Sequence, residues 1–253
     1  MGLDLQKAGI WKRIAAWMLD AVLFIVLAVG FVALFSSVLN YSDHLNELNS
    51  AYERYETEFG ISFSTSEQEY SEMTEEQRDN YHAAYDALTS DATAMKSYNL
   101  IINLTLVIIT VSLLLTYLAL EFLIPLLLGN GQTVGKKVFA IGLVRVDCVR
   151  VSNLQLLVRA LLGKFTVETM IPVYIILMLF FGTTGILGTI LLCVIGLVQI
   201  VMILATKNNL TIHDYFSGTV AIDLPSQNIF DSPEDLIKYK EKLHAEHVAR
   251  QDY

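Results

Sequence analysis

The stretch Arg13-Ile-Ala-Ala-Trp-Met-Leu-Asp20 leads directly into an apolar run, Ala21–Leu39, that contains no charged residue. Arg13 and Asp20 are seven residues apart. This is close to two turns of an α-helix, so the two side chains share one helical face. A carboxylate at a membrane boundary is costly and usually has a partner. The stretch therefore predicts a charged stripe, with Arg13 and Asp20 as a pair, at the start of a transmembrane helix.

Two further runs, Ser97–Leu120 and Thr169–Thr206, also lack charged residues, in a chain that is 54% hydrophobic and only 17% charged. A membrane span needs about 20 apolar residues, each rising about 1.5 Å. The first two runs each fit one helix. The third would extend about 57 Å as a single helix, so we expect it to fold back at Gly182–Gly185. The prediction is an all-α integral membrane protein with four transmembrane helices.

The third span needs more residues than the stretch that precedes Gly182 provides. We therefore expect it to begin near Phe165, with Lys164 extending to the membrane interface and Glu168 within its first turn. Glu168 is interpreted as an interfacial charge. A cleaved signal peptide is an alternative for the first span, but that apolar run is longer than a typical signal sequence, so an uncleaved span is expected.

Charge is distributed unevenly along the chain, whose net charge is −9. Residues 41–98 contain 13 acidic and three basic residues, whereas residues 129–167 contain six basic residues and one acidic residue. Because Lys and Arg mark cytoplasmic loops, both termini and the 129–167 region are expected in the cytoplasm of a cell-membrane protein.

The expected segments are the N-terminus with the first span (1–40), an acidic helical extracytoplasmic insertion (41–98), the second span (99–128), a cytoplasmic loop (129–164), a hairpin of two spans (165–206) and a cytoplasmic tail (207–253).

The acidic insertion carries helical signals rather than a linker composition. Thr74 and Gln77 match a capping box, and tyrosines follow at helical spacing. We expect a helix over Glu75–Ala92 that packs on a second helix around Leu45–Tyr55. The insertion is interpreted either as a solvated helical cap or as an acidic surface that attracts cations or binds a protein partner.

The predicted cytoplasmic segments contain short β-type stretches. Lys137–Asp147 and Gly218–Leu224 are rich in β-branched residues, so a small two-stranded pairing between them is expected. An isolated pair of strands is only marginally stable, so we expect this pair to pack against the membrane helices. Between them, Ser152 can cap a short helix, Asn153–Lys164, that is predicted to lie in the interface plane.

The order of these motifs resembles the RDD family of small membrane proteins, named for one arginine and two aspartates. The matching residues are Arg13, Asp20, Gly131-Gln132-Thr133-Val134-Gly135-Lys136, Arg159, His213-Asp214 and Gly218-Thr219-Val220. The resemblance covers most of the chain outside the acidic insertion and the tail. Two features depart from the family pattern, namely the long acidic insertion and Asn208-Asn209 in place of a basic pair. The resemblance implies that a sodium–proton antiport activity described for some members is one candidate function.

The charged residues that need an explanation all fall toward the predicted cytoplasmic side. They are Arg13, Asp20, Glu121, Arg159, His213 and Asp214. In the transport hypothesis, Asp20, Glu121 and Asp214 exchange a monovalent cation for a proton, Arg13 competes for them, and a homo-oligomer completes the pathway. In the alternative, the protein is a non-transporting scaffold or accessory subunit, and the cluster is a structural lock of paired charges. A His beside an Asp also suits a pH-responsive gate.

An enzyme is the third and weakest hypothesis. No metal-ligand spacing or nucleophile setting is evident, and the Gly129–Lys137 turn lacks the spacing of a phosphate-binding loop. No catalytic residue, metal, cofactor or nucleic-acid partner is therefore expected. The lipid bilayer is the expected partner.

Overall fold

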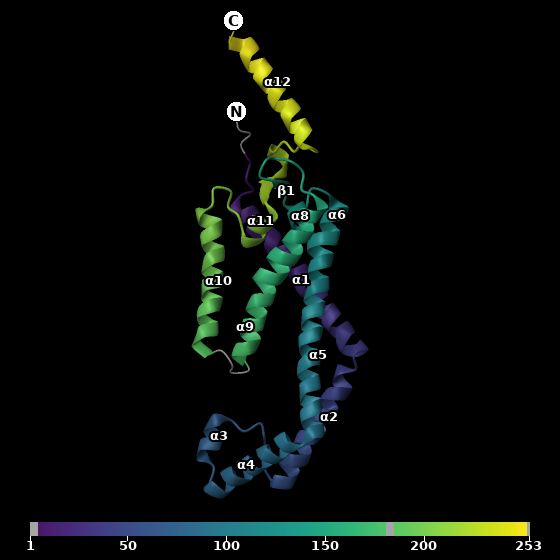
Figure 1. Cartoon of the computed structure of the whole chain (residues 1–253), viewed down its shortest axis with the longest axis vertical. Coiled ribbons are helices and arrows are strands. Elements are labelled where there is room, and N and C mark those ends of the chain that lie inside the picture. Colours follow the sequence, from purple (N-terminus) through teal and green to yellow (C-terminus); the bar gives the residue numbers. More distant parts are fainter. Residues whose placement is uncertain (1–4, 181–184, 252–253) are drawn as a thin grey trace. The chain divides into compact units, whose positions relative to one another are not determined.

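The computed structural model describes residues 5–180 and 185–251 (Figure 1). Three of the residues predicted to turn the third and fourth spans, 182–184, lie outside the described residues. The chain divides into two compact units. One consists of Val29–Ser112, and the other contains the described residues of Met1–Ala28 and Leu113–Tyr253.

Within the described residues, four helical stretches are long and apolar enough to cross a membrane: Ile10–Val38, Ala92–Leu128, Asn153–Leu179 and Gly185–Ala205. They comprise α1 (Ile10–Val38), α5 (Ala92–Tyr117), η1 (Leu118–Leu123), α6 (Ile124–Leu128), α8 (Asn153–Val158), η2 (Arg159–Met170), α9 (Ile171–Phe180) and α10 (Gly185–Ala205). Figure 1 shows α9 and α10 side by side. The predicted fold class, an all-α membrane protein, is confirmed.

The third stretch differs from the sequence prediction in its continuity. Ser152 caps α8 through a capping box with Gln155, as the sequence suggested. The helix then continues without interruption through η2, which is π-helical, into α9. A separate interfacial helix followed by a new span is therefore not observed. The physical reason is that residues 153–171 contain no proline and no second capping signal that would end the helix.

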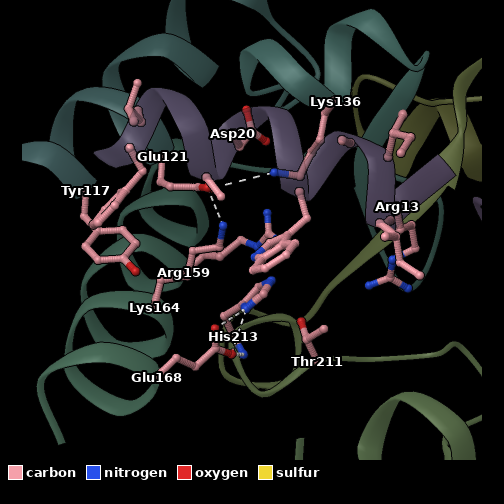
Figure 2. A pocket seen from close by; sticks show the side chains of 18 of the residues that line it. Arg13, Asp20, Tyr117, Glu121, Lys136, Arg159, Lys164, Glu168, Thr211 and His213 are labelled. Carbon is pink, nitrogen blue, oxygen red and sulfur yellow. Dashed lines mark hydrogen bonds and ion pairs between the residues drawn. The ribbon is translucent and has the colours of Figure 1, made fainter. Parts of the chain in front are cut away.

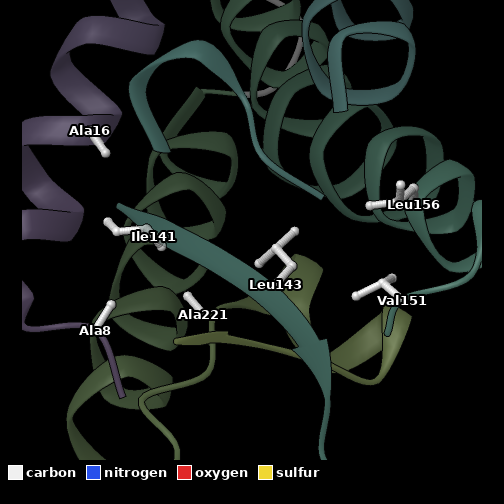
Figure 3. Packing of buried hydrophobic residues seen from close by; sticks show 7 residues of the cluster. All are labelled: Ala8, Ala16, Ile141, Leu143, Val151, Leu156 and Ala221. Atoms are coloured by element: carbon white, nitrogen blue, oxygen red, sulfur yellow. The ribbon is translucent and has the colours of Figure 1, made fainter. Parts of the chain in front are cut away.

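The predicted β pairing is confirmed. Strands β1 (Ile141–Arg145) and β2 (Thr219–Asp223) are antiparallel, with Leu143 opposite Ala221. An isolated pair of strands is only marginally stable in water. The stability of this pair therefore comes from its packing against α1 and α8. Figure 3 shows the buried cluster that joins these elements. It consists of Ala8, Ala16, Ile141, Leu143, Val151, Leu156 and Ala221.

The remaining elements of this unit are short, apart from the C-terminal helix. They are α7 (Val134–Val138), α11 (Ile212–Ser217), the 3-10 turn η3 (Leu224–Ser226) and α12 (Pro233–Gln251). Thr133 caps α7 and Thr211 caps α11, each accepting a hydrogen bond from a backbone N–H of the first turn. Both caps follow the preference for hydroxyl side chains at helix starts.

The second unit contains α2 (Tyr41–Phe59), α3 (Glu67–Glu72) and α4 (Glu75–Ser90), together with parts of α1 and α5. The predicted capping box of Thr74 and Gln77 is present at the start of α4. Leu48 of α2 and Leu88 of α4 are buried, and these two helices pack together as the sequence predicted.

Replacing Leu143 by Ala tests whether the small sheet depends on its packing. Leu143 is 1% exposed, so we expect its truncation to lower the free energy of unfolding by about 2–5 kcal/mol. Thermal unfolding of the purified protein in detergent measures the effect. Leu154→Ala is the matched control because Leu154 is 69% exposed. Equal losses in both variants would contradict the packing described here.

Candidate functional site

Asp214 is the most deeply buried charge of the predicted cluster. It lies in α11, and its side chain has no exposed surface. Its carboxylate oxygens lie 3.0 Å from Nη2 of Arg159 and 3.3 Å from Nη2 of Arg13, and the hydroxyl of Thr211 donates to one of them at 2.7 Å. Burial acts to raise the pKa of Asp214, but Arg159, Arg13 and Thr211 together hold that pKa below its ordinary value.

Arg13 and Asp20 do not pair with each other, contrary to the sequence interpretation. Arg13 binds Asp214 and also donates from Nη1 to the backbone carbonyl of Asn209 at 2.7 Å. Asp20 accepts hydrogen bonds from the Thr133 hydroxyl and a backbone N–H of α7. Seven residues along a helix correspond to about 10 Å, so each side chain instead meets a closer partner from another segment.

Asp20 is a second cap on α7. Its carboxylate accepts from the hydroxyl of Thr133 at 2.5 Å and from the backbone N–H of Gly135 at 2.7 Å. An anion at a helix N-terminus is stabilised by the unpaired N–H groups and the helix dipole. A side chain at Gly135 would clash with the backbone carbonyl of Ala16 and reach within 2.9 Å of the Asp20 carboxylate. The glycine is therefore required for α7 to approach α1 this closely.

The other residues of the Gly131–Lys136 turn hold this turn against β1. Gly131 has a φ of +61°, and a Cβ there would lie 2.9 Å from Cβ of Leu143. The buried side chain of Gln132 donates to the backbone carbonyl of Ile141 at 2.9 Å. The predicted turn residues are thus structural, since they fix α7 between the sheet and α1.

Glu121 forms the second charge network. It lies in η1, where it is 7% exposed, and it makes an ion pair with Lys164. Nζ of Lys136 lies 3.7 Å from the same carboxylate. Burial lowers the pKa of Lys136 to about 8, although Glu121 opposes this change. Lys164, which we expected to extend to the interface, is instead a partner of Glu121, and Lys136 belongs to the charge cluster as well as to the turn.

His213 contacts Glu168 more closely than its neighbour Asp214, whose Oδ1 lies 3.8 Å from Nε2 of His213. Nδ1 of His213 lies 2.8 Å from Glu168, and its backbone N–H donates to the same carboxylate at 3.1 Å. Burial, with the nearby cations, lowers the pKa of His213 well below its ordinary value, so the imidazole is neutral. Gly163 permits this contact, because a Cβ there would lie 2.5 Å from Cα of His213. Glu168 is therefore part of the cluster and not simply an interfacial charge.

These groups surround a cavity of about 630 Å³ (Figure 2). Its acidic, basic and histidine lining residues are Arg13, Asp20, Glu121, Lys136, Arg159, Lys164, Glu168 and His213, to which α1 and α10 add apolar side chains. Asp214 lies behind this lining. Within residues 5–180 and 185–251, no three His, Cys, Asp or Glu side chains form a group suited to a metal ion.

Comparison with protein-family models gives a match to the RDD family over residues 7–218. The chain belongs to the RDD family. Neither the comparison with curated proteins nor that with solved structures gives a match. In this RDD protein, the arginine and both aspartates of the family pattern are engaged within one site: Arg13 binds Asp214, and Asp20 caps α7.

Asp214→Asn tests the buried ion pairs. The change leaves two guanidinium groups facing an uncharged amide, so we expect the free energy of unfolding to fall by about 3–5 kcal/mol. Asp223→Asn is the matched control, because Asp223 pairs with a half-exposed Lys12 and its loss costs about 1 kcal/mol or less. Thermal unfolding in detergent compares the two. A loss for Asp214→Asn no greater than for the control would contradict the buried network.

Gly135→Ala tests the close approach of α7 to α1. We expect a loss of about 1–3 kcal/mol, since the added methyl group forces the two segments apart. Gly196→Ala provides the control, because its Cβ would enter open space in α10 and favour the helix slightly. If both variants unfold at the temperature of the parent protein, the contact at Gly135 does not exist as described.

Proposed function

We propose that this RDD-family protein is a non-transporting membrane scaffold or accessory subunit in which the charge cluster is a structural lock. One observation carries the proposal. The three carboxylates named as transport sites are each engaged by groups of the protein itself: Asp20 by the α7 N-terminus, Glu121 by two lysines and Asp214 by two arginines. Asp20 and Glu121 line the cavity, but a cation carrier needs carboxylates that can exchange such partners for the substrate.

The energetics favour a structural role for these pairs. Removing one partner of a buried pair costs about 3–5 kcal/mol, because the other charge is left without compensation. Asp214 connects α1 and η2 to α11, and Asp20 connects α1 to α7. The cluster thus connects the apolar helices to the two-stranded sheet and to α7 and α11. This supports a scaffold role in which the sheet and these two short helices are held rigidly for a partner.

The proposal includes an orientation and a partner surface. The excess of Lys and Arg in residues 129–167 supports a cytoplasmic position for this region and for both termini, in a cell membrane. We place the acidic residues 41–98 outside the cytoplasm, as a surface for a protein partner. The protein has no enzymatic activity in this proposal, and a homo-oligomer is compatible with it.

Cation–proton exchange is the second candidate, and one contact favours it. Glu168 lines the cavity, and its side-chain partner is the neutral His213 rather than a lysine or arginine. A carboxylate beside a neutral imidazole can change its protonation more easily than one beside a permanent cation. Glu168 therefore replaces Asp20 as the residue on which a transport hypothesis depends.

Proteoliposomes containing a pH-sensitive dye separate the two candidates. With an imposed sodium gradient we expect no proton flux above that of empty vesicles, and we expect Asp20→Asn only to lower the unfolding temperature. A sodium-dependent proton flux in the parent protein that disappears in Glu168→Gln, at an unchanged unfolding temperature, would overturn the scaffold proposal. Glu234→Gln, an exposed change at the start of α12, is the control for that substitution.

A further inference from the structure

We propose that the cavity binds a membrane phospholipid with an anionic headgroup, the headgroup among the cavity cations and an acyl chain along α1. The inference goes beyond the scaffold role and does not depend on whether the protein transports ions. Four observations carry it: the charge of the lining, the unused hydrogen-bond donors, the apolar exposed side of the cavity and its size.

The ionisable lining has one more cation than carboxylates. Its cations are Arg13, Lys136, Arg159 and Lys164, and its carboxylates are Asp20, Glu121 and Glu168. His213 is neutral, for the reason given above. Asp214 balances the network as a whole, but it lies behind the lining and has no exposed surface. The lining by itself therefore carries one net positive charge, which favours an anion over a metal cation, while Asp214, bound to Arg13 and Arg159, reduces this preference.

One donor and one acceptor of this lining have no hydrogen-bond partner within the described residues, namely Nε of Arg159 and Oε2 of Glu121. Arg159 is 3% exposed and binds Asp214 through Nη2, while its Nε has no hydrogen-bond partner within the part of the chain that the structure describes. A buried donor without a partner costs about 1–3 kcal/mol. Lys164 has three donors, of which Glu121 takes one. Phosphate oxygens suit such donors because they are charged acceptors that form strong hydrogen bonds with Arg and Lys.

The side of the cavity formed by α1 is apolar and exposed. Ile14, Trp17 and Ile25 line the cavity, yet they are 40%, 66% and 61% exposed. They lie in a segment long and apolar enough to cross a membrane, so the medium around them is lipid. A ligand reaching the cations from this side passes apolar side chains first. This arrangement selects an amphiphile over a free polar anion.

The volume is consistent with part of a lipid. A cavity of about 630 Å³ lies within the usual range of small-molecule sites, about 300–1,000 Å³. It accommodates a headgroup and the first part of a chain, while the remainder of the chains lies in the bilayer. The source of the phosphate is therefore a membrane lipid, and inorganic phosphate is the alternative that the experiment must separate.

Trp17 allows the site to be observed directly. The chain has two tryptophans, Trp11 and Trp17, and only Trp17 lines the cavity. In a Trp11→Phe background, reconstituted in phosphatidylcholine vesicles, we measure quenching of Trp17 by a small fraction of lipid with brominated acyl chains. Brominated phosphatidylglycerol is compared with brominated phosphatidylcholine. One net cation contributes about 1 kcal/mol, so we expect about fivefold stronger quenching by the anionic lipid.

Ala21→Phe tests whether this preference arises in the cavity. Ala21 is apolar and lines the cavity, so a phenyl ring there fills part of the cavity and removes no charged group. We expect the preference for the anionic lipid to disappear. Ala33→Phe is the matched control, since Ala33 is an exposed residue of α1 outside the cavity, and it should keep the preference. Unfolding temperatures of both variants show that each is folded.

Three results would overturn the proposal. The first is equal quenching of Trp17 by the two brominated lipids in the parent protein. The second is an anionic preference that persists unchanged in folded Ala21→Phe, because it would then arise from the general surface of α1. The third is loss of the preference when millimolar inorganic phosphate is added at constant ionic strength, because the site would then take the free anion and not the lipid.

Discussion

The carboxylate of Asp214 is the group on which the arrangement of this protein depends. It has no exposed surface, and a charge in such a position is tolerated only when it is paired and hydrogen-bonded. Its partners come from distant parts of the sequence: Arg13 from the first helix and Arg159 from the third apolar stretch. Because α11 leads directly into β2, the same residue also fixes where the small sheet begins.

Asp20 adds a second connection of a different kind. It neutralises the N-terminus of α7 rather than a side-chain cation, and this contact needs a glycine at position 135. The two aspartates of the family pattern therefore perform separate tasks, one inside an ion-pair network and one as a helix cap. Both contacts border a cavity that is lined by four cations and three carboxylates, which connects the structural account to the proposed lipid site.

The sequence was sufficient to predict the four spans and the strand pair, because apolar runs, capping boxes and β-branched stretches act locally, but it did not predict that α8 continues through η2 into the third span. It also indicated most residues of the site, since a charge in an apolar run is conspicuous. It could not predict partners: sharing a helical face places Arg13 and Asp20 in one direction but does not bring them into contact. Lys164 and Glu168 were interpreted as interfacial because they flank an apolar run, and their true partners lie elsewhere in the chain.

A double-mutant cycle tests the central claim, that Arg13 pairs with Asp214 and not with Asp20. The free energy of unfolding is measured for Arg13→Gln, Asp214→Asn and the double variant, and then for the same cycle with Asp20→Asn. The account predicts a coupling energy of about 1–3 kcal/mol between Arg13 and Asp214, and a much smaller one, below about 0.5 kcal/mol, between Arg13 and Asp20. The reverse order of the two coupling energies would contradict it.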